Sequence, residues 1–73
     1  MKRTIHVIVR RGDGGYVAEC ADLNVAGQAA TLDHLVRDLR EAIALLLDGV
    51  EPREYGLAVN PTILVTIELG PAV

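Results

Sequence analysis

Residues 31–50 contain the strongest regular pattern in the sequence, a stripe of apolar side chains at helical spacing. The stripe comprises Leu32, Leu35, Val36, Leu39, Ala42, Ile43, Leu46, Leu47 and Val50. Thr31 precedes it as a good N-cap, because its hydroxyl can accept a backbone N–H of the first turn. Gly49 suits the left-handed position after a helix, and Pro52 prevents the helix from resuming. A single amphipathic helix must bury its stripe against a sheet, so the sequence predicts an α+β fold.

Four segments have the alternation or the β-branched content of strands: residues 4–10, 16–20, 25–29 and 62–69. Gly12-Asp13-Gly14-Gly15 predicts a hairpin turn between the first two, since Asp-Gly and Gly-Gly steps supply positive φ. Residues 51–60 are predicted to be a connection that ends in an Asn60-Pro61 turn. The expected order is β-β-β-α-β, in a mostly antiparallel, curled sheet with the helix on one face.

The same alternation assigns side chains to the two faces of the sheet. The face toward the helix is predicted to hold Ile5, Val7, Val9, Ile63, Val65, Ile67 and Leu69. The opposite face is predicted to show Ile8, Ala18, Cys20 and Leu64 among His6, Tyr16 and Thr66. This second face is half apolar, which leaves two interpretations open. It is either an interface, or it is covered by a thin second layer that the connection around Leu57 forms.

A chain of 73 residues has room for one domain, residues 1–73, which buries only about 60% of its extended surface. Its one cysteine, Cys20, excludes an internal disulfide and is expected to be a small buried hydrophobic residue. Cys20, His6 and His34 do not have the spacing of a zinc site. The hydrophobic fraction of 51% and the mean hydropathy of +0.32 exceed what one helix and one sheet face require. We therefore expect a homo-oligomer, a dimer or larger.

Charge and hydropathy also restrict the partners and the location. No apolar run approaches the roughly 20 residues of a membrane-spanning helix. The basic start of the chain leads into an alternating strand, not into the apolar core of a signal peptide, so a cytoplasmic protein is predicted. The net charge of −3 and the pI of about 5.1 argue against direct binding of nucleic acid, because neutralising phosphates requires a basic surface. They favour a basic protein partner.

Residues that could support catalysis are few. The chain contains no serine, and neither histidine has a nucleophile beside it in the sequence. Glu19 and Asp22 lie close in the sequence, with Asp13 at the hairpin end, and a metal-dependent enzyme that uses Glu19 and Asp22 is one alternative. The simpler interpretation is solvated acids at strand ends, since the first strand supplies no carboxylate. The Gly-rich turn is followed by a strand and not by the helix that a phosphate-binding loop requires. We expect no catalytic, cofactor or metal site.

Three motifs at fixed spacing resemble those of the HicB antitoxin family. They are Gly15-Tyr16-Val17-Ala18-Glu19-Cys20-Ala21-Asp22-Leu23, Gln28-Ala29-Ala30-Thr31-Leu32, and Glu41-Ala42. The family pattern is a hairpin strand reading G-x-Y-x-A-x-x-P-D-L, a short strand ending near Q-G-x-T, a helix opening T-x-x-E-A, and a later E-A-L. The resemblance covers residues from about 4 to 50, and the element order extends it to the last strand.

The sequence departs from this pattern at Ala21, where Pro is usual, at Ala29, where Gly is usual, and at His34, where an acid is usual. Family members that repress transcription also carry a C-terminal DNA-binding segment. A chain that ends at Val73 leaves no room for one, so regulation through DNA is not expected. The resemblance implies a partial ribonuclease-H-like fold without its catalytic acids. It also implies a function, the masking of a HicA-type toxin, which is a small and usually basic ribonuclease.

The leading hypothesis is therefore a HicB-like antitoxin-type binding protein that masks a small basic ribonuclease by direct contact. The alternative is an orphan self-associating module with no toxin partner. For either function, the predicted partner-interface residues are Asp13, Tyr16, Glu19 and Asp22 around the hairpin, with Ile8 and Leu64 on the half-apolar face.

Overall fold

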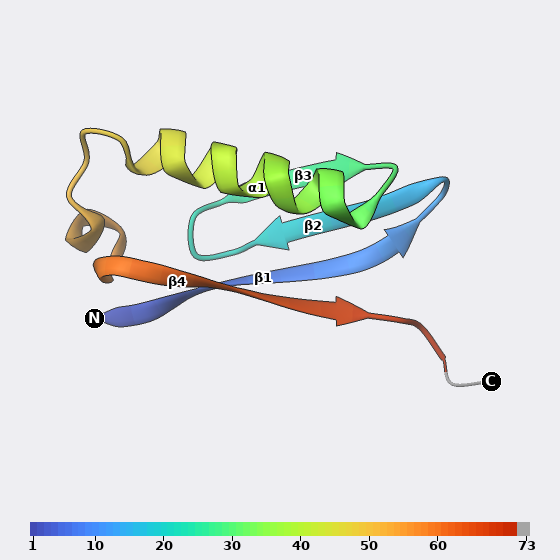
Figure 1. Ribbon diagram of the computed structural model, residues 1–73. Helices are drawn as coiled ribbons and strands as arrows, with labels where there is room; N and C mark the ends of the chain where they lie inside the picture. The colour runs from blue at the N-terminus through green and yellow to red at the C-terminus, as the bar shows by residue number, and fades with distance from the viewer. Residues whose placement is uncertain (72–73) are drawn as a thin grey trace.

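The computed structural model describes residues 1–71, which form one four-stranded sheet and one long helix (Figure 1). The elements in chain order are β1 (Lys2–Gly12), β2 (Gly15–Cys20), β3 (Val25–Ala29), α1 (Leu32–Leu47), a short 3-10 helix η1 (Pro52–Tyr55) and β4 (Leu57–Glu68). The α+β class and the β-β-β-α-β order predicted from the sequence are confirmed.

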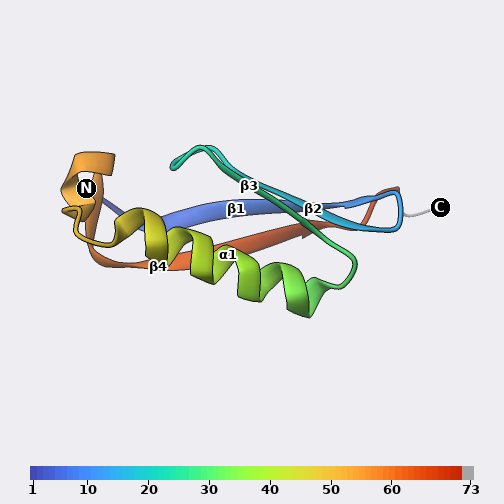
Figure 2. The same cartoon turned by 90° about the horizontal axis from the view of Figure 1, so that it is seen from above.

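The strands lie in the order β3-β2-β1-β4. The pairs β1–β2 and β2–β3 are antiparallel, whereas β1 and β4 run parallel. The chain therefore leaves the sheet at one edge, β3, and returns at the opposite edge, β4. The helix α1 lies along one face of the sheet, closest to β3 and β2, and residues 48–56 with η1 complete the crossing to β4 (Figures 1 and 2).

The hairpin between β1 and β2 has the tight turn that the Gly-rich segment predicts. Gly12 pairs with Gly15, which leaves Asp13 and Gly14 as the turn, and Gly14 has a φ of 77°. Gly15 is required for a second reason, since a Cβ added there would lie 2.3 Å from the carbonyl oxygen of Ala29. The segment thus belongs to a hairpin and does not open into a helix.

Both ends of α1 agree with the sequence signals. The hydroxyl of Thr31 accepts the backbone N–H of His34 at 3.2 Å, which is the predicted N-cap. The helix ends at Leu47, and Gly49 takes a φ of 73° two residues later. This left-handed position removes Gly49 and the residues after it from the helix.

The core lies between α1 and the face of the sheet that it covers. It consists of Ile5, Val7, Val9, Ala18, Cys20, Leu23, Leu35, Leu39, Ile43 and Leu57, each at most 6% exposed. The prediction that Cys20 is a small buried hydrophobic residue is confirmed. The backbone of α1 runs closest to β2 and β3. Gly27 of β3 lies beneath the helix, where an added Cβ would make an ordinary contact, 3.5 Å from Leu35.

The predicted assignment of β2 to the opposite face is wrong for Ala18, Cys20 and Tyr16. Ala18 pairs with Val9, and both are fully buried under α1, while Cys20 and Tyr16 pack on the same side. The reason is the register, because pairing Gly12 with Gly15 places odd-numbered residues of β1 opposite even-numbered residues of β2. The opposite face receives Val17 and Glu19 instead.

The last strand begins at Leu57, earlier than the predicted start at Thr62. The register with β1 shifts between Lys2 and Thr4, and Asn60 has a φ of 53°. The predicted Asn60-Pro61 turn is therefore an irregularity within β4. Leu57 is only 1% exposed and belongs to the core, so a second layer around Leu57 on the opposite face is also wrong.

The helix covers β4 less than the sequence predicts. Ile63 and Val65 are partly buried beside the core, but Ile67 is 38% exposed and Leu69 is 81% exposed. The prediction of a helix-side face is thus correct for β1 and only partly correct for β4. The position of α1 above β2 and β3 explains the difference.

We expect Gly15→Ala to lower the free energy of unfolding by about 1–3 kcal/mol, the usual cost of an overpacked contact. The added Cβ meets the backbone of Ala29, which cannot move aside without disturbing β3. The matched control is Gly27→Ala, whose Cβ lies at an ordinary contact distance of 3.5 Å from Leu35. Urea unfolding followed by circular dichroism measures both variants. Equal effects would contradict this steric explanation.

Candidate interaction surface

The open face is the face of the sheet turned away from α1. Its residues alternate with the buried ones and are Thr4, His6, Ile8 and Arg10 of β1, Val17 and Glu19 of β2, and Thr62, Leu64, Thr66 and Glu68 of β4. Ile8 is partly buried, and Leu64 is 52% exposed. They lie diagonally across the β1–β4 pair, where His6 and Thr66 share a side-chain hydrogen bond. Two of the predicted interface residues thus lie together on a mainly polar face.

Glu19, a third predicted residue, is engaged within the chain on the same open face. Nη1 of Arg10 lies 3.5 Å from Oε2 of Glu19, and Nε of Arg10 lies 3.2 Å from Oε2 of Glu68. These contacts join β2, β1 and β4 across the face. All three side chains are at least half exposed, so water screens the pairs and their contribution to stability is small.

Asp22 completes the pairing of β1 beyond the end of β2. One carboxylate oxygen accepts the backbone N–H of His6 at 3.3 Å, and the other lies 2.7 Å from Nζ of Lys2. The Lys2 hydrogen bond, followed by the His6 backbone N–H, lowers the pKa of Asp22 below its usual 3.8. The same contact raises the pKa of Lys2. Asp22 therefore has a role in holding the sheet together, which the sequence did not reveal.

The remaining predicted residues, Asp13 and Tyr16, lie at the hairpin end and not beside the others. Asp13 is exposed at the turn. Tyr16 packs partly against the core on the α1 side, and the guanidinium of Arg11 lies 5.9 Å from the centre of its ring. The structure thus divides the six candidates between the open face with its margin and the hairpin end.

A surface that the sequence analysis missed runs along β4. The backbone N–H of His6 points toward β2, because Asp22 accepts it there, so the alternate residues Ile5, Val7 and Val9 direct their backbone groups toward β4. In a parallel pair this orients the backbone N–H and C=O of Ile63, Val65 and Ile67 away from β1. No strand within residues 1–71 pairs with this outer row. We call residues 62–68 the β4 edge.

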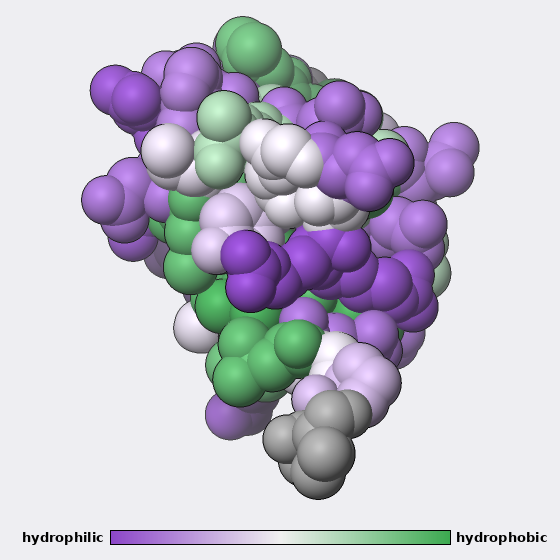
Figure 3. All heavy atoms as spheres, turned by 90° about the vertical axis from the view of Figure 1, so that its right-hand side faces the viewer, coloured by the Kyte–Doolittle hydropathy of each residue, from purple (hydrophilic) through white to green (hydrophobic). Residues whose placement is uncertain are grey.

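Exposed apolar side chains lie on the β4 edge and next to it in the sequence. Val59, Leu64, Ile67 and Leu69 are exposed by 78%, 52%, 38% and 81%. Between the edge and the helix lies a groove of about 310 Å³, the α1–β4 groove, lined by Val36, Leu39, Arg40, Pro61, Thr62, Ile63 and Val65. Figure 3 shows hydrophobic side chains at the surface beside the end of the described chain. The signal in the sequence was the apolar run of this strand, which one helix cannot cover completely.

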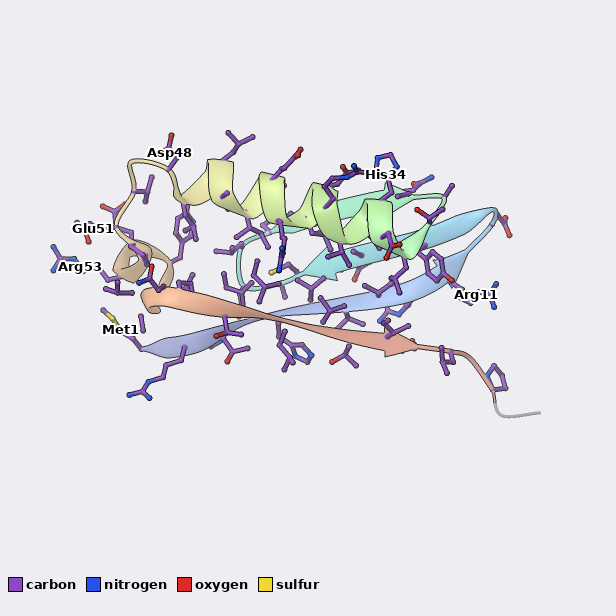
Figure 4. All side chains as sticks on the ribbon, in the orientation of Figure 1. Met1, Arg11, His34, Asp48, Glu51 and Arg53 are labelled. Atoms are coloured by element: carbon purple, nitrogen blue, oxygen red, sulfur yellow. The ribbon has the colours of Figure 1, made fainter. Side chains whose placement is uncertain are left out.

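The excess of negative charge belongs to segments outside the strands. Residues 1–30 and 56–73 together hold four basic and four acidic side chains, so the entire net charge of −3 belongs to residues 31–55. Three acidic residues of this segment, Asp48, Glu51 and Glu54, follow the end of α1 and lie around η1. We call this part of the surface the acidic end. Figure 4 shows Asp48, Glu51 and Arg53 projecting from one end of the molecule.

Comparison with family models, with curated proteins and with solved structures finds no match to this chain. Within residues 1–71, no helix combines the length and the apolar character needed to cross a membrane. Over the same residues, no three His, Cys, Asp or Glu side chains converge in the manner of a metal site.

The Asp22 contacts predict a dependence of stability on pH. Because the folded-state pKa of Asp22 is lowered, its contribution is complete above about pH 4 and is lost as the pH falls through the folded-state value. We expect Asp22→Asn to lower the melting temperature at pH 7, and this difference from the unaltered protein to shrink as the pH falls from 4 to 2. Asp13→Asn at the exposed turn is the control. Thermal unfolding between these pH values measures all three proteins, and a constant difference would contradict the role of Asp22.

Proposed function

We propose that the chain is a protein-binding domain of the HicB antitoxin type, which masks a small basic ribonuclease by direct contact. The proposal begins with the resemblance of residues 15–32 to that family. Several motif residues have structural roles. Gly15 lies against the backbone of Ala29, Asp22 accepts a hydrogen bond from β1, and Thr31 caps α1. These structural roles support a similarity of fold to that family. Because a fold alone does not determine function, the function is argued from the surface.

The observation that carries the proposal is the separation of charge. The acidic end holds three carboxylates and one opposing cation, Arg53, whereas the sheet and its turns are neutral. Exposed apolar groups occur in the same region, with Leu45 76% exposed and Tyr55 36% exposed. Charge of one sign around apolar contacts attracts a partner of the opposite sign and gives it an area to bury. A small basic ribonuclease satisfies both conditions.

The test is to express the chain together with the product of an adjacent reading frame that encodes a short basic protein. We expect the two proteins to co-purify, and the ribonuclease activity of the basic protein to fall in the complex. Reversing the acidic end with Asp48→Lys, Glu51→Lys and Glu54→Lys should weaken binding by about tenfold or more at low salt, because steering and contact both depend on these charges.

The matched control reverses three other acids, Asp33→Lys, Asp38→Lys and Glu41→Lys, and so changes the net charge equally. It should weaken binding by less than about threefold, since steering falls off with distance through salt screening. A further variant, Asp13→Lys with Glu19→Lys, tests the surface that the sequence predicted. Equal losses from the acidic-end and control triples would contradict docking at the acidic end. An uninhibited ribonuclease would contradict the antitoxin function itself.

A further inference from the structure

We infer that the β4 edge pairs with the β4 edge of a second copy of this chain, antiparallel and about a two-fold axis near Val65. Two sheets would then join into one continuous eight-stranded sheet with both helices on the same face. This inference goes beyond ribonuclease masking and is independent of it, because it uses other residues. It rests on four features of the β4 edge: its backbone, its lack of protection, its apolar faces and its charge.

The backbone of the edge is ready for another strand. Ile63, Val65 and Ile67 direct their N–H and C=O groups outward, and no strand within residues 1–71 accepts them. An antiparallel mate uses the same alternate residues on both strands. With Val65 opposite Val65 of the second copy, Ile63 lies opposite Ile67, and the outward groups of the two strands meet.

The edge carries none of the usual devices that prevent such pairing. Natural edge strands are protected by charged side chains, prolines, bulges or a covering segment. In β4 these occur only at the ends, as the irregularity at Asn60-Pro61 and as Glu68. Residues 62–67 contain no charge, proline or glycine. The unprotected stretch is therefore bounded, and its length suits a short strand pairing.

Pairing in this register would cover the apolar groups that the helix leaves exposed. Ile63, Val65 and Ile67 face the α1 side, where Ile63 and Val65 line the α1–β4 groove. The corresponding residues of the second copy would extend this apolar surface beneath Val36. On the open face, Leu64 would lie opposite Thr66 of the second copy. Cross-strand contacts of these kinds are the unit of sheet stabilisation.

Charge selects a second copy in the antiparallel direction. Glu68 is the one charged residue of the β4 edge, and the chosen register places it opposite Thr62 of the other copy. Near that position the open face has a hollow lined by Lys2, Arg3, Thr4, His6, Asp22 and Leu64. Glu68 of one copy thus approaches the basic start of β1 in the other copy, twice by symmetry. Parallel pairing would instead place the two Glu68 carboxylates side by side.

The net charge of each copy does not oppose this arrangement. Of the net charge in residues 31–55, −1 belongs to α1, which runs closest to β2 and β3, and −2 belongs to the acidic end, which lies near the start of β4 and away from Val65. A two-fold axis at β4 would also direct the two acidic ends toward opposite ends of the dimer. Both would stay exposed for a basic partner.

Sedimentation of the full chain tests the inference. We expect a dimer, and Ile67→Lys should raise its dissociation constant by about tenfold or more, because a charge enters the apolar contact with Ile63 of the second copy. Leu45→Lys on the exposed side of α1 is the matched control and should leave the dimer intact. A strict monomer at high micromolar concentration, or a dimer that Ile67→Lys leaves unchanged, would overturn the inference.

Cross-linking keeps the test decisive if Ile67→Lys fails to fold. In the proposed register residue 65 faces itself at about 5.5 Å between Cα atoms, within reach of a disulfide. Val65→Cys should therefore form an intermolecular disulfide on mild oxidation, whereas Leu45→Cys should not. Cys20 does not interfere, because it is 2% exposed. Cross-linking at residue 45 and not at residue 65 would place the interface elsewhere and overturn the proposal.

Discussion

The width of one helix against the width of the sheet is the constraint on which the rest of this structure depends. An α-helix with its side chains is about 10–12 Å wide, whereas the outer axes of four strands lie about 14 Å apart. One helix therefore cannot cover the whole face, and some apolar strand surface must remain uncovered. The connection from β3 to α1 is only Ala30-Thr31, which keeps the helix on the β3 side. The small residues Ala18 and Gly27 lie beneath α1 on this side of the sheet, and β4 is left partly uncovered.

The parallel β1–β4 pair is the second consequence of this arrangement. Because α1 and the connection after it lead from one edge of the sheet to the other, β4 joins β1 on the side that β2 leaves free and becomes a new edge. Leu57 secures the start of β4 in the core, and the irregularity at Asn60 then resets the register for Thr62 onward. Leu57 at the start of β4 is thus buried, whereas Ile67 near its end lies beyond the part of the sheet that the helix covers. The same topology therefore buries Leu57 in the core and leaves the β4 edge without a neighbouring strand within residues 1–71.

Sequence reasoning succeeded where the determinants are local. The cap at Thr31, the left-handed Gly49 and the Gly12–Gly15 turn each depend on neighbours within a few residues, and all three are found. It failed where the register between paired strands decides the outcome. The face of β2 depends on register, and a shift of one residue exchanges Ala18 for Val17. Asn60-Pro61 has the composition of a turn, yet it lies within β4, between Leu57 and Thr62, which both pair with β1.

The interface residues were also only partly predictable from the sequence. Polar residues attract attention in a sequence, but Asp22 bonds to β1 and Glu19 bonds to Arg10, so part of their capacity is used within the chain. Leu64 was found because alternation placed it correctly, whereas Ile67 was assigned to the core, since no pattern reports how far a helix extends over a sheet. The surfaces available for partners are those that the fold cannot satisfy by itself. They are a largely apolar edge at β4 and an acidic end at η1, and their separation would allow the proposed contacts with a second copy and with a basic protein to form together.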